Sequence, residues 1–241
     1  MSKLIYRLTI VAAALALLML AVSGPGTRLD LWEFRFGFSL MRWATWVGLA
    51  SALVALVMLI WPRLRQGRIL GLTAALLMAV IAAAVPLHGL FTVRSLPMIH
   101  DISTDLDQPP QFVAVLPLRA DAPNPPEHPG EEVADQQRQA YPDISTLTLN
   151  RPAVATFAIA LAAAEQMGWE IVAAEPTEGR IEAVATTFWY GFRDDVVVRV
   201  GSDNGASRID VRSKSRVGLS DVGANARRIR QYLDRVRQAA G

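Results

Sequence analysis

The sequence predicts an α+β protein with three N-terminal transmembrane helices and a soluble domain built on an antiparallel sheet. Two observations support this prediction. Hydrophobic residues make up 52% of the chain, and their excess lies in three apolar stretches near the N-terminus. The remainder alternates short strand-like runs with turn residues and contains two helical patterns, which favours about four strands with two packed helices. We therefore expect a transmembrane anchor over residues 1–92 and a soluble domain over residues 93–241.

The three apolar stretches cover about residues 4–22, 43–61 and 69–91. A helix needs roughly 20 apolar residues to cross a hydrocarbon core about 30 Å thick, and the second and third stretches meet this requirement. The first stretch is uninterrupted only from Leu8 to Val22, which is shorter, and residues 4–6 can extend it. A cleaved signal peptide is the alternative there, because Lys3 and Arg7 precede this run and small residues occur at 21–23. Gly24 and Pro25 are expected to end this helix.

Basic residues near the helix ends set the expected orientation. The short loop 62–68 contains three arginines, and Lys3 and Arg7 lie before the first apolar stretch. Such residues favour the cytoplasmic side, so three crossings place the C-terminal domain on the non-cytoplasmic side. We expect an integral protein of a bacterial inner membrane with a periplasmic domain in the cell envelope. No apolar stretch has an ionisable residue near its centre, which argues against a transporter or pump.

Composition excludes several classes of site and partner. The chain has no cysteine, so disulfides, thiolate nucleophiles and cysteine-based metal sites are ruled out. Residues 1–92 contain eight basic and two acidic residues, so the positive charge flanks the membrane helices. The soluble domain has more acidic than basic residues, and nucleic acid is therefore not an expected partner.

The sequence of the soluble domain predicts the order of its loops, helices and strands. A Pro-rich surface loop is expected over about residues 117–142. A helix should begin near Asn150 or Arg151 and end before Gly168. Strands are expected over about 169–174, 180–190, 196–200 and 208–212, joined by short turns typical of antiparallel neighbours. The last helix should cover about residues 221–239, with Ser220 as its N-cap.

Several segments of the soluble domain resemble one known family. They are His100 to Asp105 with Pro109 and Pro110, Ala183 to Thr187, Phe192 to Val200, Asp210 to Gly218, Ser220 to Ala226, and Arg228 to Arg230. Over about residues 93–233 the chain resembles the domain of unknown function 1499 family, and it is similar in architecture to members with several N-terminal membrane helices. The resemblance implies a domain boundary. It implies no established activity and no catalytic residue.

The segment 210–228 carries the densest group of polar residues in the soluble domain. Seven of them are candidate ligand-binding or partner-binding residues: Arg212, Ser213, Ser215, Arg216, Asp221, Asn225 and Arg228. Backbone N–H groups at a helix start, with nearby arginines and hydroxyls, form a natural site for a phosphate, a carboxylate or a lipid headgroup.

A structural network is the alternative for this segment. It would close the sheet onto the last helix by pairing Asp194, Asp195, Asp210 and Asp221 with Arg199, Arg212, Arg216 and Arg228. An extended strand would place Asp210, Arg212, Lys214 and Arg216 on one face, and Val211, Ser213 and Ser215 on the other. The two hypotheses use the same residues and differ in whether their charges are available to a ligand.

Four further aspartates are second choices for a binding site: Asp101, Asp105, Asp194 and Asp195. His100 beside Asp101 invites a metal hypothesis, but no second suitable histidine accompanies it, so no metal or other cofactor is expected. Asp194 and Asp195 are neighbours on an expected strand, so they should point to opposite faces and cannot readily share one substrate. No serine lies in a G-x-S-x-G motif, and no catalytic residue is identified.

The leading hypothesis is a membrane-anchored, non-enzymatic binding or assembly module. It would dock an envelope protein partner or bind an anionic ligand just outside the lipid bilayer. One alternative is a carrier or sensor of lipids or other hydrophobic molecules, which needs an apolar cavity between sheet and helices. Another is an envelope hydrolase that acts on a phosphoester or a glycan, which needs clustered, solvent-facing aspartates.

Overall fold

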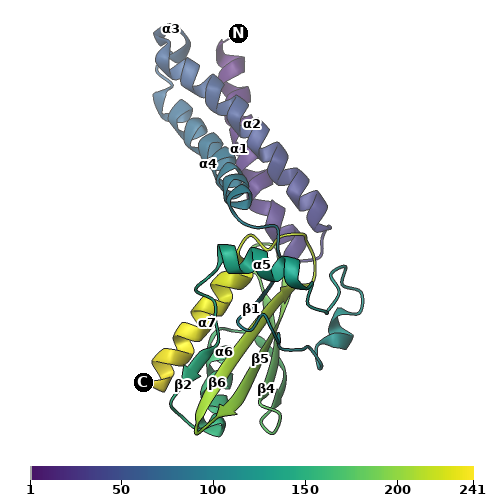
Figure 1. Ribbon diagram of the computed structural model, residues 1–241. Coiled ribbons are helices and arrows are strands. Elements are labelled where there is room, and N and C mark those ends of the chain that lie inside the picture. Colours follow the sequence, from purple (N-terminus) through teal and green to yellow (C-terminus); the bar gives the residue numbers. More distant parts are fainter. Residues whose placement is uncertain (1) are drawn as a thin grey trace. The chain divides into compact units, whose positions relative to one another are not determined.

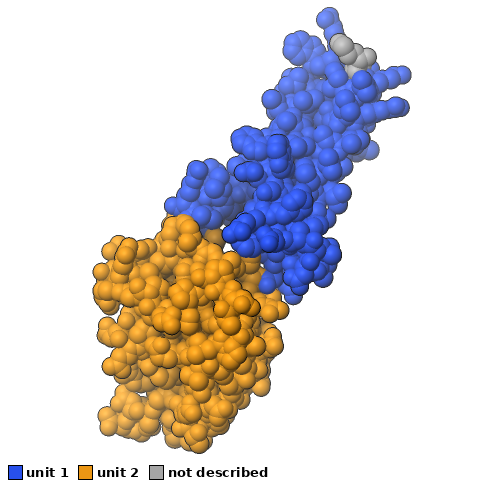
Figure 2. All heavy atoms as spheres, turned by 90° about the vertical axis from the view of Figure 1, so that its right-hand side faces the viewer, with its two compact units in different colours: residues 1–94, 188–191 blue, residues 95–187, 192–241 orange. Residues whose placement is uncertain are grey.

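The computed structural model describes residues 2–241, and the chain divides into two compact units (Figures 1 and 2). Unit 1 contains the residues up to Arg94 together with the segment 188–191. Unit 2 contains residues 95–187 and 192–241. Unit 1 thus combines the N-terminal helices with a short segment that lies far along the sequence.

Unit 1 is built from long apolar helices. These are α1 (Ser2–Arg28), α2 (Phe34–Ile60) and α4 (Ile69–Ser95), with the short helix α3 (Pro62–Arg65) before α4. The three long helices are long and apolar enough to cross a membrane. They expose many large leucine, valine, isoleucine and tryptophan side chains, as expected of helices that face lipid. The chain is therefore a membrane protein with three candidate spans.

The first helix does not end at Gly24 and Pro25, as the sequence predicts. It continues to Arg28 with Pro25 inside it, and the Leu29 amide donates to the Pro25 carbonyl at 3.0 Å. Transmembrane helices tolerate proline because neighbouring groups and small local adjustments satisfy the freed backbone. The second helix likewise begins at Phe34 rather than near residue 43.

Small residues let α1 and α2 approach each other closely. Gly37 of α2 is buried, and a Cβ atom there would lie 2.5 Å from the Ser23 carbonyl oxygen and 2.8 Å from Thr27 Oγ1 of α1. Close backbone approach through small residues is a usual packing mode between membrane helices, where the hydrophobic effect does not drive association. The sequence of α1 and α2 therefore supports a packed helix pair.

Unit 2 contains an antiparallel sheet of six strands, not the four that the sequence predicts (Figure 1). The strands are β1 (Asp101–Ser103), β2 (Leu147–Leu149), β3 (Glu170–Glu175), β4 (Arg180–Thr186), β5 (Arg193–Asp203) and β6 (Ala206–Ser215). The order is β1-β6-β5-β4-β3, and β2 also pairs with β6. The two missed strands have three residues each, too few for alternating hydrophobicity to mark them.

Two helices pack on one face of this sheet, namely α6 (Ala153–Gln166) and α7 (Ala224–Ala240). The core between them is filled by apolar side chains from both helices and from alternate positions of the strands. Tyr232 of α7 is fully buried, donates its hydroxyl to the Ala160 carbonyl at 2.9 Å, and stacks on Trp169 with ring centroids 5.0 Å apart. The predicted α+β arrangement is confirmed.

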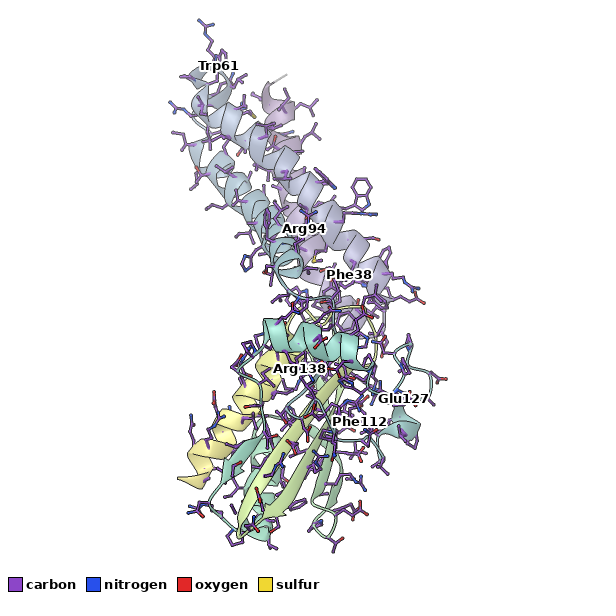
Figure 3. The ribbon with its side chains drawn as sticks, viewed as in Figure 1. Phe38, Trp61, Arg94, Phe112, Glu127 and Arg138 are labelled. Atoms are coloured by element: carbon purple, nitrogen blue, oxygen red, sulfur yellow. The ribbon has the colours of Figure 1, made fainter. Side chains whose placement is uncertain are left out.

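The other face of the sheet is covered by the segment 104–130, which includes the 3₁₀ helix η1 (Leu116–Arg119) (Figure 3). Phe112 and Val115 of this segment pack on Val197 of β5 and form a small separate core. The charged residues of β5 and β6 that lie under this segment form the first part of the candidate site.

Helix α5 (Glu131–Ala140) lies where the sequence predicts a Pro-rich surface loop. Its Gln137 side chain donates to the Ser103 carbonyl at 2.6 Å and accepts from the Ser103 amide at 3.0 Å. This pairing satisfies backbone groups of β1. Short helices with few apolar residues depend on such tertiary contacts for their stability, and propensity alone does not reveal them.

The last helix begins at Ala224 with Gly223 as its N-cap, three residues later than predicted. Its cap is also not Ser220. The Asp221 carboxylate accepts from the Gly223 amide at 2.8 Å and from the Asn225 amide at 2.7 Å. The chain turns here through Val222 at φ 53° and Gly223 at φ 70°. A positive φ is costly for a β-branched residue, so the surrounding contacts hold Val222 in this conformation.

Candidate functional site

Strand β6 carries polar side chains on both faces. Asp210, Arg212 and Lys214 lie on the face covered by the segment 104–130, whereas Ser213 and Ser215 face α7. This is the division that an extended strand predicts, because successive side chains point to opposite faces. All five side chains are buried, so each needs an internal partner.

Asp101 of β1 is the shared partner of two cations on the covered face. Its carboxylate accepts from Arg212 Nε at 2.9 Å, from Arg212 Nη2 at 2.8 Å and from Lys214 Nζ at 2.9 Å. Burial alone would raise the pKa of Asp101, but the hydrogen bonds and charges of Arg212 and Lys214 outweigh it and hold this pKa below its ordinary value. Asp101 is therefore an ionised structural anion.

Backbone carbonyls of the covering segment accept the remaining hydrogens of these cations. Arg212 donates to the carbonyls of Pro110 at 3.2 Å and Pro126 at 2.8 Å, and Lys214 donates to the Glu127 carbonyl at 2.6 Å. Phe112 and Glu127 of this segment are labelled in Figure 3. Because charged donors form the stronger class of hydrogen bond, these contacts hold the segment over the sheet.

A second buried carboxylate, Asp195 of β5, also binds two arginines. Arg119 of η1 donates to it at 3.0 Å, and Arg216 donates through Nη2 at 2.6 Å and through Nε at 3.0 Å. Both arginines also donate to backbone carbonyls of the covering segment, namely those of Asn124 and Leu118. The ion pairs therefore bind the segment 104–130 to β5 and β6.

A third carboxylate, Glu182 of β4, accepts three successive backbone amides. The N–H groups of Val113, Ala114 and Val115 lie 2.9 to 3.1 Å from its oxygens, and Arg180 also donates to it. Consecutive amides around one anion form a typical anion nest. Here the anion is the protein's own side chain.

Arg199 of β5 bridges two further aspartates at the edge of this layer. It donates to Asp105 and to Asp210, at 2.8 Å in each case. Asp210 also accepts from the Thr146 hydroxyl at 2.5 Å and from the Thr104 hydroxyl at 3.3 Å. Asp105 is thereby held by an arginine, as Asp101 and Asp195 are.

The helix-facing side of the sheet has its own polar network. The Ser213 hydroxyl donates to Asn225 Oδ1 at 2.7 Å, and Asn225 Nδ2 donates to the Ser215 hydroxyl at 3.0 Å. Arg228 of α7 donates to Ser213 Oγ at 2.9 Å and to Asp194 Oδ2 at 2.5 Å. This network ties α7 to β5 and β6.

The amides at the start of α7 are also occupied from within. Asp221 accepts two of them, from Gly223 and Asn225. Burial raises the pKa of Asp221, and these hydrogen bonds offset that effect only in part. Two of the backbone amides that could bind an anion at this helix start are therefore already bound to the Asp221 carboxylate.

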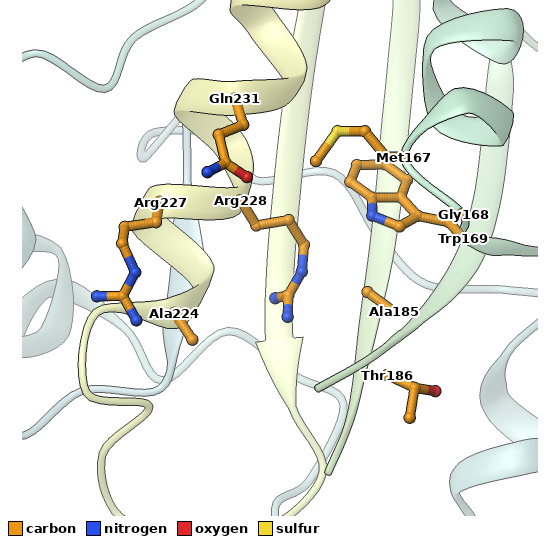
Figure 4. Close-up of a pocket in the computed structure, with 9 residues that line it drawn as sticks. All are labelled: Met167, Gly168, Trp169, Ala185, Thr186, Ala224, Arg227, Arg228 and Gln231. Atoms are coloured by element: carbon orange, nitrogen blue, oxygen red, sulfur yellow. The ribbon is translucent and has the colours of Figure 1, made fainter. Parts of the chain in front are cut away.

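A surface cavity of about 220 Å³ lies between α7, the end of α6 and the end of β4 (Figure 4). It is lined by Met167, Gly168, Trp169, Ala185, Thr186, Ala224, Arg227, Arg228 and Gln231. In Figure 4 the α7 residues lie on one side, and the β4 residues and Met167 to Trp169, which follow α6, lie on the other. Arg227 is exposed and donates to the Val222 carbonyl at 3.0 Å; across residues 2–241 it forms no ion pair.

The aspartates are not arranged for metal binding or for acid/base chemistry. Within the described part of the chain, residues 2–241, no three His, Asp or Glu side chains are placed to hold a metal ion. Asp194 binds Arg228 on the helix side, and Asp195 binds Arg119 on the covered side. Each is buried and bound to an arginine, so neither is a solvent-facing general base.

The family model described as "Protein of unknown function (DUF1499)" matches residues 101–236. The chain belongs to this family. No curated protein matches the chain. The match begins at the first residue of β1 and ends within α7. The DUF1499 domain therefore contains the sheet, its two packed helices and the buried charges, whereas α1, α2 and α4 lie outside the matched range.

The DUF1499 domain sorts the residues predicted from the sequence into separate groups. The covered face holds Asp101 with Arg212, Asp195 with Arg216, and Asp105 with Arg199; the helix face holds Asp194, Ser213, Ser215, Asn225 and Arg228; and Asp221 caps α7. They do not form one pocket. Of all of them, only Arg228 lines the cavity beside α7.

Several contributors to this DUF1499 site escaped sequence reasoning. Arg119 is a buried partner of Asp195, and Glu182 is a buried partner of Arg180. Arg227 and Gln231 line the cavity. Arg119 lies in a segment with no regular period, so nothing local marks it as buried. Glu182 does carry a signal, because it is an acidic residue between the apolar residues Ile181 and Ala183 of a strand. A charge at such a position indicates a buried partner.

Proposed function

We propose that this chain is a membrane-anchored, non-enzymatic binding module whose DUF1499 domain holds a small anionic group in the cavity beside α7. The observation that carries the proposal is Arg227, which lines the cavity, is exposed, and has no carboxylate partner among residues 2–241. A guanidinium presents its donors in a planar fork that matches phosphate and carboxylate oxygens. The ligand class is therefore a phosphate ester or a carboxylate.

The other lining residues add donors and shape to the proposed site. Arg228 is balanced by Asp194, so it contributes oriented N–H groups rather than net charge. Gln231 offers a carboxamide and Thr186 a hydroxyl, while Trp169 supplies an apolar wall. A volume of about 220 Å³ suits a headgroup-sized anion and is below the roughly 300–1,000 Å³ typical of pockets for drug-sized ligands.

We also propose that the domain lies on the non-cytoplasmic side of a bacterial inner membrane, as a periplasmic part of the cell envelope. Arg63, Arg65 and Arg68 lie in or beside the short connection between α2 and α4. Lys3 and Arg7 lie at the same end of the helical region, where the Arg68 guanidinium carbon is 5.1 Å from the centre of the Tyr6 ring. Basic residues favour the cytoplasmic side, and three candidate spans then carry the chain to the opposite side.

The two alternative functions receive less support. A carrier of hydrophobic molecules needs an apolar cavity between sheet and helices, but apolar side chains fill this layer. A hydrolase needs accessible acidic groups, but Asp101, Asp194 and Asp195 are buried and paired with arginines. The cavity beside α7 holds no carboxylate, so it favours binding over general acid/base catalysis.

The test compares three full-length proteins purified from their native membrane in mild detergent: wild type, Arg227→Gln and Arg235→Gln. Arg235 is exposed on α7 and does not line the cavity, so it is a matched control on the same helix. Mass spectrometry then identifies every molecule that each protein retains. We expect wild type and Arg235→Gln to retain the same phosphate ester or carboxylate, and Arg227→Gln to lose most of it.

Two results would contradict the proposal. One is equal retention of anionic molecules by all three proteins, which would place the binding elsewhere. The other is a stoichiometric protein partner retained without any small anion and without dependence on Arg227. That second result would favour an assembly module, in which the domain docks an envelope protein.

A further inference from the structure

The loop Phe188 to Gly191 joins β4 to β5, yet it groups with the membrane helices in unit 1. Its sequence is Phe-Trp-Tyr-Gly. The loop is closed by hydrogen bonds between Thr187 and Phe192, at 2.8 Å in both directions. The three consecutive aromatic residues of this loop are not part of the core of unit 2, and they contact residues of unit 1 instead.

Arg28, the last residue of α1, holds the backbone of this loop. Its Nη1 donates to the Phe188 carbonyl at 2.7 Å, and its guanidinium carbon lies 6.0 Å from the centre of the Phe188 ring. Gly191 adopts φ 72°, and a Cβ atom there would lie 3.1 Å from the Cα and the Cγ of Arg28. The loop is thus fitted closely to the end of α1.

The other two aromatic residues pack on α1 and α2. A Cβ atom on Gly24 would lie 2.1 Å from Cδ1 of Trp189, so the indole uses the space that the glycine leaves. Tyr190 packs edge-to-face on Phe38 with ring centroids 5.0 Å apart, and its hydroxyl lies 3.8 Å from the Met41 sulfur. All these partners lie near the end of α1 and the start of α2, which form one end of the helix pair.

This end of the helix pair has the composition of a membrane interface. Trp43 and Phe36 are exposed on α2, and Trp32 packs edge-to-face on Phe36. Tryptophan and tyrosine are enriched where a membrane helix leaves the hydrocarbon, because one part of the ring is apolar and another is polar. Phe188 is 83% exposed within this group. Apart from the Arg28 guanidinium, most of the Phe188 surface is therefore open to the surroundings.

We propose that the loop Phe188 to Gly191 is a membrane-interface element, with Phe188 and Trp189 inserted among the phospholipid headgroups beside α1 and α2. Arg28 and Gly24 set its position: the arginine fixes the loop backbone, and the glycine admits the indole. The occupant of the exposed aromatic surface is the phospholipid bilayer, because that surface is continuous with helices that themselves face lipid. The inference is independent of the proposed anion site.

The natural absence of cysteine makes this loop directly testable. Phe188→Cys, in the full-length chain, is labelled with a nitroxide and reconstituted in phosphatidylcholine vesicles. Relaxation of the nitroxide is measured with oxygen, which concentrates in the bilayer, and with a water-soluble nickel chelate. Leu15→Cys on α1 is the bilayer control at 50% exposure, and Val154→Cys at the start of α6 is the aqueous control at 84% exposure.

We expect the ratio of oxygen to nickel accessibility at position 188 to lie between the ratios at positions 154 and 15, and to be clearly above that at position 154. A ratio at position 188 equal to that at position 154 would overturn the proposal. Wild-type protein provides a second measurement that needs no substitution. In vesicles containing a lipid with a photoreactive headgroup, adducts on the peptide containing Phe188 and Trp189 support the proposal, and adducts confined to the helices overturn it.

Discussion

Asp101 and Arg212 bind each other from neighbouring strands through two hydrogen bonds, of 2.9 and 2.8 Å, and both side chains are fully buried. Lys214 bonds the same carboxylate, so Asp101 balances two buried cations. A buried ion pair adds little net stability because desolvation offsets its attraction. Removal of one member is costly, however, because the other charge remains buried and unpaired. The three-residue strand β1 thus supplies the anion on which the covered face depends.

Asp101→Asn should strongly destabilise the DUF1499 domain. The substitution keeps the shape of the side chain but leaves Arg212 and Lys214 without their shared counter-charge. Breaking one partner of a buried ion pair typically costs about 3–5 kcal/mol. Hydrogen exchange of the β6 amides, measured by mass spectrometry on full-length protein in detergent, reports the free energy of opening.

The matched control is Asp143→Asn. Asp143 pairs with Arg230 at 2.5 and 2.7 Å, in an ion pair whose two side chains are both exposed. Exposed ion pairs contribute about 0–1 kcal/mol, so the β6 amides should exchange nearly as in wild type. Equal exchange in the two variants would show that the buried pair has no special structural role.

The cost of Asp101→Asn should shrink at acid pH. The pKa of Asp101 in the folded state lies below its ordinary value. A group of this kind contributes stability that is complete above its unfolded pKa and is lost as the pH falls through its folded pKa. The difference in unfolding free energy between wild type and Asp101→Asn should therefore be constant near neutral pH and fall toward zero in acid. A difference that grows in acid would contradict an ionised Asp101.

Asp221 should show the opposite sign, because burial raises its pKa in the folded state. Its contribution is complete below the unfolded pKa and is lost as the pH rises through the folded pKa. The pH dependence of wild type alone therefore mixes the two aspartates. The comparison of wild type with Asp101→Asn at each pH removes the Asp221 contribution, since both proteins contain it.

Gly24→Leu should release the loop Phe188 to Gly191 from the helices. A side chain at position 24 would occupy the space of the Trp189 indole, 2.1 Å away. Overpacking of this kind typically costs about 1–3 kcal/mol. The amides of the loop, and that of Phe192 which bonds to Thr187, should exchange faster in hydrogen-exchange measurements.

Gly89→Leu is the control for this substitution. Gly89 lies in α4, and a Cβ atom there would have no neighbour within 4 Å. The same residue change should therefore leave the exchange of the loop unchanged. Faster exchange in both variants would mean that added bulk in the membrane helices, rather than loss of the Trp189 contact, is responsible.

The parts of the site that follow a regular period could be predicted from the sequence. The alternation of Asp210, Arg212 and Lys214 with Val211, Ser213 and Ser215 assigns the two faces of β6, and Asp194 and Asp195 separate for the same reason. The apolar stripe of α7 is equally regular, since Ile229, Leu233 and Val236 recur at helical spacing and are buried.

The parts set by tertiary contact could not be predicted. Strands β1 and β2 are too short to show a period, and they exist because β6 offers them an edge. Arg119 reaches Asp195 from a segment without regular structure. The start of α7 shifts because Asp221, rather than Ser220, accepts the amides at the helix start. For β1, β2 and Arg119 the partner is distant in the sequence, whereas the choice of Asp221 depends on the turn at Val222 and Gly223.

The most direct test of the anion-binding proposal is the reaction of Arg227 with phenylglyoxal in the full-length protein, with and without inorganic phosphate at constant ionic strength. Mass spectrometry gives the labelling rates of Arg227 and of the exposed control Arg235 in the same sample. The account predicts that phosphate slows the labelling of Arg227 in a saturable manner and leaves Arg235 unchanged. Phosphate dependence that is the same for both arginines, with no specific slowing of Arg227, would contradict it.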